Sequence, residues 1–211
     1  MTLGYHQFEH LLLTHCTPTL IKRKLGSMFH LDNRYSDVHE LVEYYDQILN
    51  LQGLRINLFF SHGRYTVYVY LPSSLKYLMT NKDIQSFLKQ YDYPDHDILS
   101  HLEKRLEMSQ YPHEIGLFLG YPLADVWGFV HHKKCQCCGY WKVYENKREK
   151  ESLFKQFDCC KKEFILLYEQ GYSLSQILNQ ADNQPFSFTG TAIVSETSVS
   201  ATIPQMRYIQ K

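Results

Sequence analysis

The sequence lacks a surplus of charge of either sign. Its 211 residues contain 22 Lys and Arg against 22 Asp and Glu, so the formal net charge is zero with histidine neutral. Nucleic-acid-binding proteins normally carry a basic excess, because neutralising phosphates drives their affinity. We therefore expect no nucleic-acid partner, although the eleven histidines would make the chain positive on mild acidification.

Long apolar runs are also missing. No stretch approaches the roughly eighteen consecutive apolar residues of a membrane span. The N-terminal segment MTLGYHQFEHLLLTHC has neither the basic region nor the long apolar run of a signal peptide. We expect a cytoplasmic protein without a membrane span, whose six cysteines are reduced thiols or metal ligands rather than disulfides.

Familiar catalytic signatures are absent as well. The sequence contains no Walker loop, no dinucleotide fingerprint, no G-x-S-x-G and no H-E-x-x-H. His113-Glu114 lacks the second histidine of a zincin, so that class of zinc protease is excluded. The sequence therefore names no reaction, and it leaves a small molecule or another protein open as the partner.

What the sequence does contain is typical of a folded protein, with 44% hydrophobic and 21% charged residues. Alternating β-branched and aromatic residues over 54–60 and 65–71 predict a hairpin. Residues 140–144 predict a third strand, which we expect to join it. We predict an α+β fold, a small antiparallel sheet (hairpin 54–71 plus strand 140–144) packed with several helices. Apolar periodicity and capping residues predict helices over 5–13, 17–25, 72–79, 112–119, 122–130 and 149–170, with others starting after Asp37, Asn81, Asp95 and Ser173.

Domain organisation follows from a change of composition near Ala181. Beyond it serine, threonine, asparagine and glutamine dominate, and Pro185 and Pro204 interrupt the chain. We predict a single domain over 1–180 and a flexible C-terminal tail over 181–211.

Cys16 has the local sequence of a reactive thiol. Thr17-Pro18 is typical of a helix N-cap and first helical position, which would place Cys16 just before a helix that ends at Gly26. The helix dipole would then lower the pKa of the thiol. Drawn with His113 as base and Glu114 as orienting acid, Cys16 could be a catalytic nucleophile. Adjacent side chains seldom orient each other, however, and Glu114 could simply favour a helix N-terminus.

A second group of thiols lies in the stretch 112–144 and beyond it. Cys135-x-Cys137-Cys138, beside His131 and His132, could hold zinc or iron. The spacing lacks the paired C-x-x-C knuckles of structural zinc sites. Cys159 and Cys160 are adjacent on a predicted helix and point about 100° apart, so at most one could join. The candidate metal ligands are Cys135, Cys138 and Cys160, and ordinary thiols are the alternative.

Three segments resemble the signature segments of a bacterial family. They are HCTPTL at 15–20, PHEIGLFLGYPL at 112–123 and GYWKVY at 139–144. The resemblance spans roughly residues 8–170. It is to a family of about this length, found in anaerobes and labelled only as a domain of unknown function. It implies that Cys16, Cys138 and Cys160 recur in the family, whereas Cys135, Cys137 and Cys159 are extras.

These observations lead to three hypotheses of function. The first is a thiol-dependent metal- or cofactor-binding protein, with aromatic residues such as Tyr140, Trp141 and Tyr144 lining a pocket or filling the core. The second is an enzyme that uses Cys16 as its nucleophile, and the third is a non-catalytic interaction module. Both site hypotheses predict Cys16, His113 and Cys138 within about 10 Å of one another. The apolar stripe of the last long helix predicts that Cys160 is buried.

Overall fold

The central sheet is antiparallel and has three strands. The computed structural model describes residues 1–108 and 112–183. In it β1 (Gly26–Asp32), β2 (Arg55–Ser61) and β3 (Arg64–Tyr70) lie in the order β1-β3-β2. The predicted hairpin is confirmed as β2–β3. Its two-residue turn, His62-Gly63, has positive φ at both positions (52° and 74°), as a type I′ turn requires.

Helix α1 (Tyr5–Leu20) corrects the prediction for the N-terminal region. Instead of a new helix starting at Thr17, α1 runs through Pro18, which removes one backbone hydrogen bond near the helix end. Burial outweighs that cost, because α1 keeps one apolar stripe inside the protein up to Leu20. The residues beyond the predicted stop at Gly26 form strand β1, which the sequence analysis missed.

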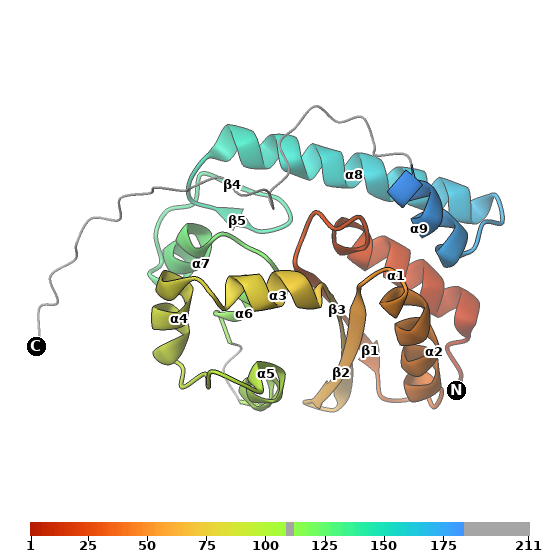
Figure 1. The fold of residues 1–211 in the computed structure, drawn as a ribbon, viewed down its shortest axis with the longest axis horizontal. Helices are drawn as coiled ribbons and strands as arrows, with labels where there is room; N and C mark the ends of the chain where they lie inside the picture. Colours follow the sequence, from red (N-terminus) through yellow and green to blue (C-terminus); the bar gives the residue numbers. More distant parts are fainter. Residues whose placement is uncertain (109–111, 184–211) are drawn as a thin grey trace, which may run out of the picture.

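Helices cover both faces of the sheet (Figure 1). One face packs against α1, α2 (Val38–Asn50), α8 (Lys147–Glu169) and α9 (Leu174–Asn183). The other packs against α3 (Pro72–Leu78), α4 (Lys82–Lys89), α5 (Ile98–Leu106), α6 (Ile115–Phe118) and α7 (Leu123–Val130). Residues of β3 alternate between the cores, Val67 and Val69 into the first and Tyr68 into the second. The predicted α+β class is confirmed.

Helices α8 and α9, near the end of the described chain, form hydrogen bonds to α1 near its beginning. The Tyr168 hydroxyl of α8 donates a hydrogen bond to the His6 carbonyl oxygen at 2.9 Å. The Leu174 amide, at the start of α9, donates to the Glu9 carboxylate. The first core therefore includes residues from both the beginning and the end of the described chain.

The predicted third strand does not join the hairpin. Instead β5 (Lys142–Val143) pairs with β4 (Cys137–Cys138) in a separate two-stranded sheet. Asp125 of α7 explains the difference, because its carboxylate accepts hydrogen bonds from Trp141 Nε1 at 2.8 Å and from the Tyr144 amide at 2.7 Å. These contacts hold the segment against α7, and Trp141 packs into a third core beneath α8.

Two further expectations concern the C-terminal region and the membrane. Helix α9 extends to Asn183, past the predicted boundary at 181, and the rest of the predicted tail, 184–211, lies outside the described residues. Within 1–108 and 112–183, no helix combines the length and apolar character needed to cross a membrane.

Candidate functional site

Cys16 lies inside α1 and is fully buried. Because the helix begins at Tyr5, the expected helix start next to this thiol is wrong. Burial raises the pKa of Cys16 to about 12, and the positive charge of Lys24 offsets only part of that effect. The thiol is therefore protonated near neutral pH, the opposite of the activation predicted from Thr17-Pro18.

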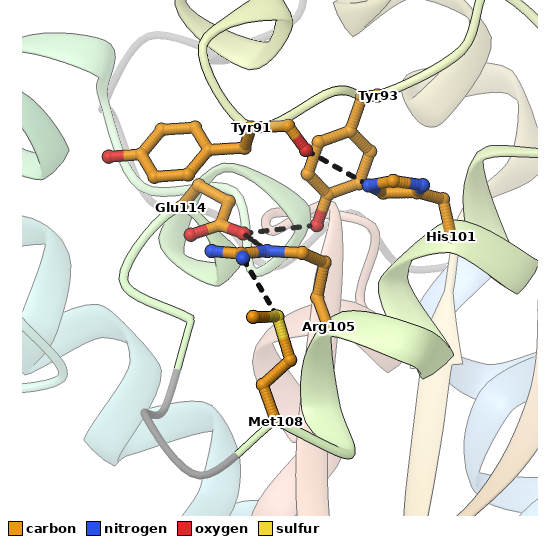
Figure 2. Close-up of polar contacts among 6 residues, drawn as sticks. All are labelled: Tyr91, Tyr93, His101, Arg105, Met108 and Glu114. Carbon is orange, nitrogen blue, oxygen red and sulfur yellow. Dashed lines mark hydrogen bonds and ion pairs between the residues drawn. The ribbon is translucent and has the colours of Figure 1, made fainter.

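Glu114 belongs to an internal network rather than to a pair with His113. Its side chain is completely buried, and its Oε1 accepts a hydrogen bond from Arg105 Nε at 2.7 Å and one from the Tyr93 hydroxyl at 3.4 Å (Figure 2). Its Oε2 has no hydrogen-bond partner among the described residues. The Glu114 carboxylate raises the pKa of Arg105, whose Nη1 donates to Met108 Sδ at 3.0 Å. Glu114 thus ties the segment before α6 to α5.

His113 faces different neighbours. Its ring packs edge-to-face on Phe129 of α7, with 5.0 Å between ring centroids. The ammonium of Lys142 lies over the same Phe129 ring, 5.0 Å from its centroid. Lys142 is paired with Cys138 in the two-stranded sheet of β4 and β5. His113 and the Cys138 hairpin therefore share a neighbourhood around Phe129. The expected separation of about 10 Å between Cys16, His113 and Cys138 stays a prediction.

The cysteines proposed as metal ligands differ in burial. Cys135 and Cys138 are exposed, whereas Cys160 is buried on the inner face of α8, as its apolar stripe predicted. Across residues 1–108 and 112–183, no group of three or more His, Cys, Asp or Glu side chains is arranged to hold a metal ion. The metal assignment of Cys135, Cys138 and Cys160 therefore has no geometric support here.

Lys24, which the sequence analysis overlooked, lies where the three signature segments meet. It belongs to the loop between α1 and β1, and its Nζ lies 5.4 Å from the centroid of the Tyr121 ring. Surrounding protein lowers the pKa of Lys24 to about 8, and the nearby Cys16 opposes that change. No carboxylate of the described residues lies within ion-pair distance of its ammonium.

Tyr121 connects Lys24 to the third segment. Its ring stacks on Trp141 with 4.9 Å between centroids, and its hydroxyl donates to the Tyr140 carbonyl oxygen at 3.3 Å. Just before it, Gly120 has a φ of +76°, and a Cβ there would lie 2.8 Å from the Leu25 amide nitrogen. We call Cys16, Lys24, Tyr121 and Trp141 the Lys24 junction.

The chemistry available at the Lys24 junction is that of an amine partly withdrawn from water. With a pKa of about 8, roughly a tenth of Lys24 is unprotonated at pH 7. A desolvated lysine is one of the recurrent protein nucleophiles, and it attacks carbonyl carbons. A short loop between two elements gives no periodic signal, so the burial of this lysine could not be inferred from sequence.

Fold and site together define an α+β protein with helices on both faces of a small sheet and a desolvated lysine where its signature segments converge. The chain belongs to the family described as "Protein of unknown function (DUF3793)", which it matches over residues 12–178. That range includes the whole Lys24 junction and agrees with the resemblance found in the sequence. No curated protein and no solved structure matches the chain.

Proposed function

We propose that this protein binds a small cofactor or metabolite through a carbonyl group that reacts reversibly with Lys24. The observation that carries the proposal is an amine that lies 5.4 Å from the centroid of the Tyr121 ring, with no carboxylate partner among the described residues; its lowered pKa agrees with this setting. Lysines of ordinary surface character pair with acids or stay hydrated, and their amines are protonated at neutral pH. Lys24 is partly exposed.

The reaction is the formation of a Schiff base. The unprotonated Nζ of Lys24 attacks the carbonyl carbon of an aldehyde or ketone, a C=N bond forms, and the carbonyl oxygen leaves as water. The step involves no oxidant or reductant and is reversed by hydrolysis.

Cys16 does not react in this proposal, but its charge affects Lys24. A thiolate beside Lys24 would hold the amine in its protonated form, because opposite charges favour each other. Burial keeps the Cys16 thiol neutral and so leaves the amine free to lose its proton. Cys16 is then a neutral neighbour of Lys24, and not the nucleophile.

Reductive trapping tests the proposal. The full chain would be treated with glyoxylate or propanal and cyanoborohydride at pH 7.5, and the modified lysines would be located by peptide mass spectrometry. We expect Lys24 to react faster than Lys22, an exposed lysine of the same loop that is paired with Asp182 at 2.9 Å. Trapping at Lys24 no faster than at Lys22 would refute the proposal.

The pH dependence provides a second readout. Only the unprotonated amine reacts, so the rate of modification at Lys24 should rise with pH and level off above about 8. An ordinary lysine would keep gaining reactivity towards about pH 10. A Lys24 profile that follows the ordinary lysines would contradict the lowered pKa. Cys16→Ser, which keeps a neutral group, should retain the profile.

The earlier thiol hypotheses have less support than this amine. The raised pKa of Cys16 disfavours a catalytic thiolate, and the described residues bring no three metal-binding side chains together. Elemental analysis of protein purified without oxygen tests for zinc or iron directly. All six cysteines are free, which supports a reducing compartment such as the cytoplasm.

A further inference from the structure

A second candidate site lies at the turn end of the central sheet, on the face covered by α5. A cavity of about 210 Å³ opens there between the β2–β3 turn and the end of α5. Its strand side is lined by basic and hydroxyl-bearing residues, which are His30, Ser61, His62, Arg64 and Thr66. Nothing in the Lys24 junction contributes to it.

The strand register explains why these side chains share one face. Thr66 lies opposite His30 of β1, and Arg64 lies opposite Ser61 of β2. Residues two apart on a strand point to the same side, so Arg64 and Thr66 project together. Thr66 and Ser61 are buried, with exposed fractions of 1% and 9%, and so form the floor of the cavity.

One hydrogen bond joins two side chains of the cavity lining. His30 Nδ1 is 2.8 Å from the Thr66 hydroxyl, which fixes the imidazole ring and leaves its Nε2 outside that bond. His62 belongs to the type I′ turn and lines the cavity together with Arg64. One guanidinium and two imidazoles thus stand around two buried hydroxyl groups.

The balance of charge in the cavity is basic. Among the described residues, no Asp or Glu lines it. Asp32 lies opposite Arg64 in the sheet, but its carboxylate contacts Arg34, with Oδ2 3.5 Å from Arg34 Nε and Oδ1 accepting from the Arg34 amide at 2.9 Å. Arg64 itself has no ion pair of 4.0 Å or less with the described carboxylates.

The side of the cavity formed by α5 is apolar. Leu106 and Met108 line it there, and Arg105 donates a hydrogen bond to Met108 Sδ (Figure 2). Because Glu114 holds Arg105 in turn, the buried Glu114–Arg105 pair sets the position of this rim. A ligand would therefore meet one guanidinium, two imidazoles and two hydroxyls on one side and two apolar side chains on the other.

We infer that this cavity binds a phosphate group, either as the free ion or as the monoester of a small molecule. The planar fork of Arg64 matches two phosphate oxygens, His62 and the Ser61 hydroxyl supply further donors, and the hydrogen-bonded His30–Thr66 pair supplies one more. The volume suits one phosphate group with a small substituent, which Leu106 and Met108 would contact. The site does not depend on the proposed reaction of Lys24.

Backbone-resolved NMR titration of the full chain tests this inference at constant ionic strength. Inorganic phosphate and phenyl phosphate would be the probes, with chloride as the reference anion. We expect shifts at the β2–β3 turn and at the end of β1, and binding roughly tenfold weaker in Arg64→Gln. Arg55→Gln is the control, since it removes a guanidinium at the opposite end of β2 that does not line the cavity.

The relative affinities of the two probes distinguish a site for the free ion from a site for a monoester. Tighter binding of phenyl phosphate assigns the cavity to a monoester, and equal or tighter binding of inorganic phosphate assigns it to the free ion. An absence of phosphate-dependent shifts at these residues overturns the inference, and so does an Arg55→Gln variant that binds as weakly as Arg64→Gln. Lys24→Met should bind phosphate normally, so failure of the Schiff-base proposal would leave this result standing.

Discussion

We expect the ion pair between Arg105 and Glu114 to contribute far more to the free energy of unfolding than the exposed arginine–carboxylate pairs do. In Arg105→Met the Glu114 carboxylate would be left fully buried with only the long contact from the Tyr93 hydroxyl. Removing one partner of a buried pair typically costs about 3–5 kcal/mol. Because the Arg105 side chain is 21% exposed, we expect the lower end, about 3 kcal/mol.

The reverse change and the double change give the sharper test. Glu114→Met leaves a cation that can turn towards water, so its cost should be smaller, about 1–2 kcal/mol. The double variant Arg105→Met, Glu114→Met replaces both charges with apolar groups, which is often close to neutral. We therefore expect the double variant to be more stable than Arg105→Met alone.

The measurement is urea unfolding, followed by far-UV circular dichroism and tryptophan fluorescence. Arg55→Met serves as the control, since Arg55 pairs with Asp46 at 2.9 Å but is 47% exposed, and exposed pairs contribute about 0–1 kcal/mol. The reasoning is refuted if Arg105→Met costs no more than Arg55→Met. It is equally refuted if the double variant is the least stable of the set.

Two further predictions concern the backbone at the Lys24 junction and the thiols. Gly120→Ala should lower the free energy of unfolding by more than about 2 kcal/mol, because it combines a positive φ with a clash against Leu25. Gly53→Ala, at a glycine with positive φ but open space, should cost about 1 kcal/mol. Equal losses in Tm for the two variants would contradict the close approach of Gly120 to Leu25. Alkylation by iodoacetamide at pH 8 should modify exposed thiols within minutes but leave Cys16 and Cys160 intact until urea unfolds the chain. Rapid modification of Cys16 in the folded protein would restore the hypothesis that it is a nucleophile. The exposed thiols expected to react are Cys135, Cys138 and Cys159.

The elements that the sequence predicted well are those whose signals are local. The hairpin is an example, because side-chain alternation and a turn with glycine at positive φ act within one segment. Thr17-Pro18 misled the prediction because it is a valid local start signal, but the apolar stripe that includes Leu12, Cys16 and Leu20 extends α1 past it. Burial across the whole helix outweighs one lost hydrogen bond.

The features that the sequence did not predict depend on contacts between segments distant in the chain. The aromatic stretch at 140–144 has the composition of a strand, but Asp125 anchors Trp141 to α7 and prevents it from reaching the hairpin. The burial of Glu114 and the desolvation of Lys24 depend on neighbours distant in the sequence, which no periodicity reveals. The charged residues of the candidate sites were therefore less predictable than the apolar ones.

The return of α8 and α9 onto α1 has a consequence for how the chain is made. The first core needs residues near both ends of the described chain, such as Phe8 and Ile177. At a synthesis rate of about 5–20 residues per second, the ribosome takes on the order of ten seconds to go from the end of β3 to α9. During that interval the α1 surface that receives the two late helices has no partner. The apolar stripe of α1 is thus covered only late in synthesis, when α8 and α9 have been made.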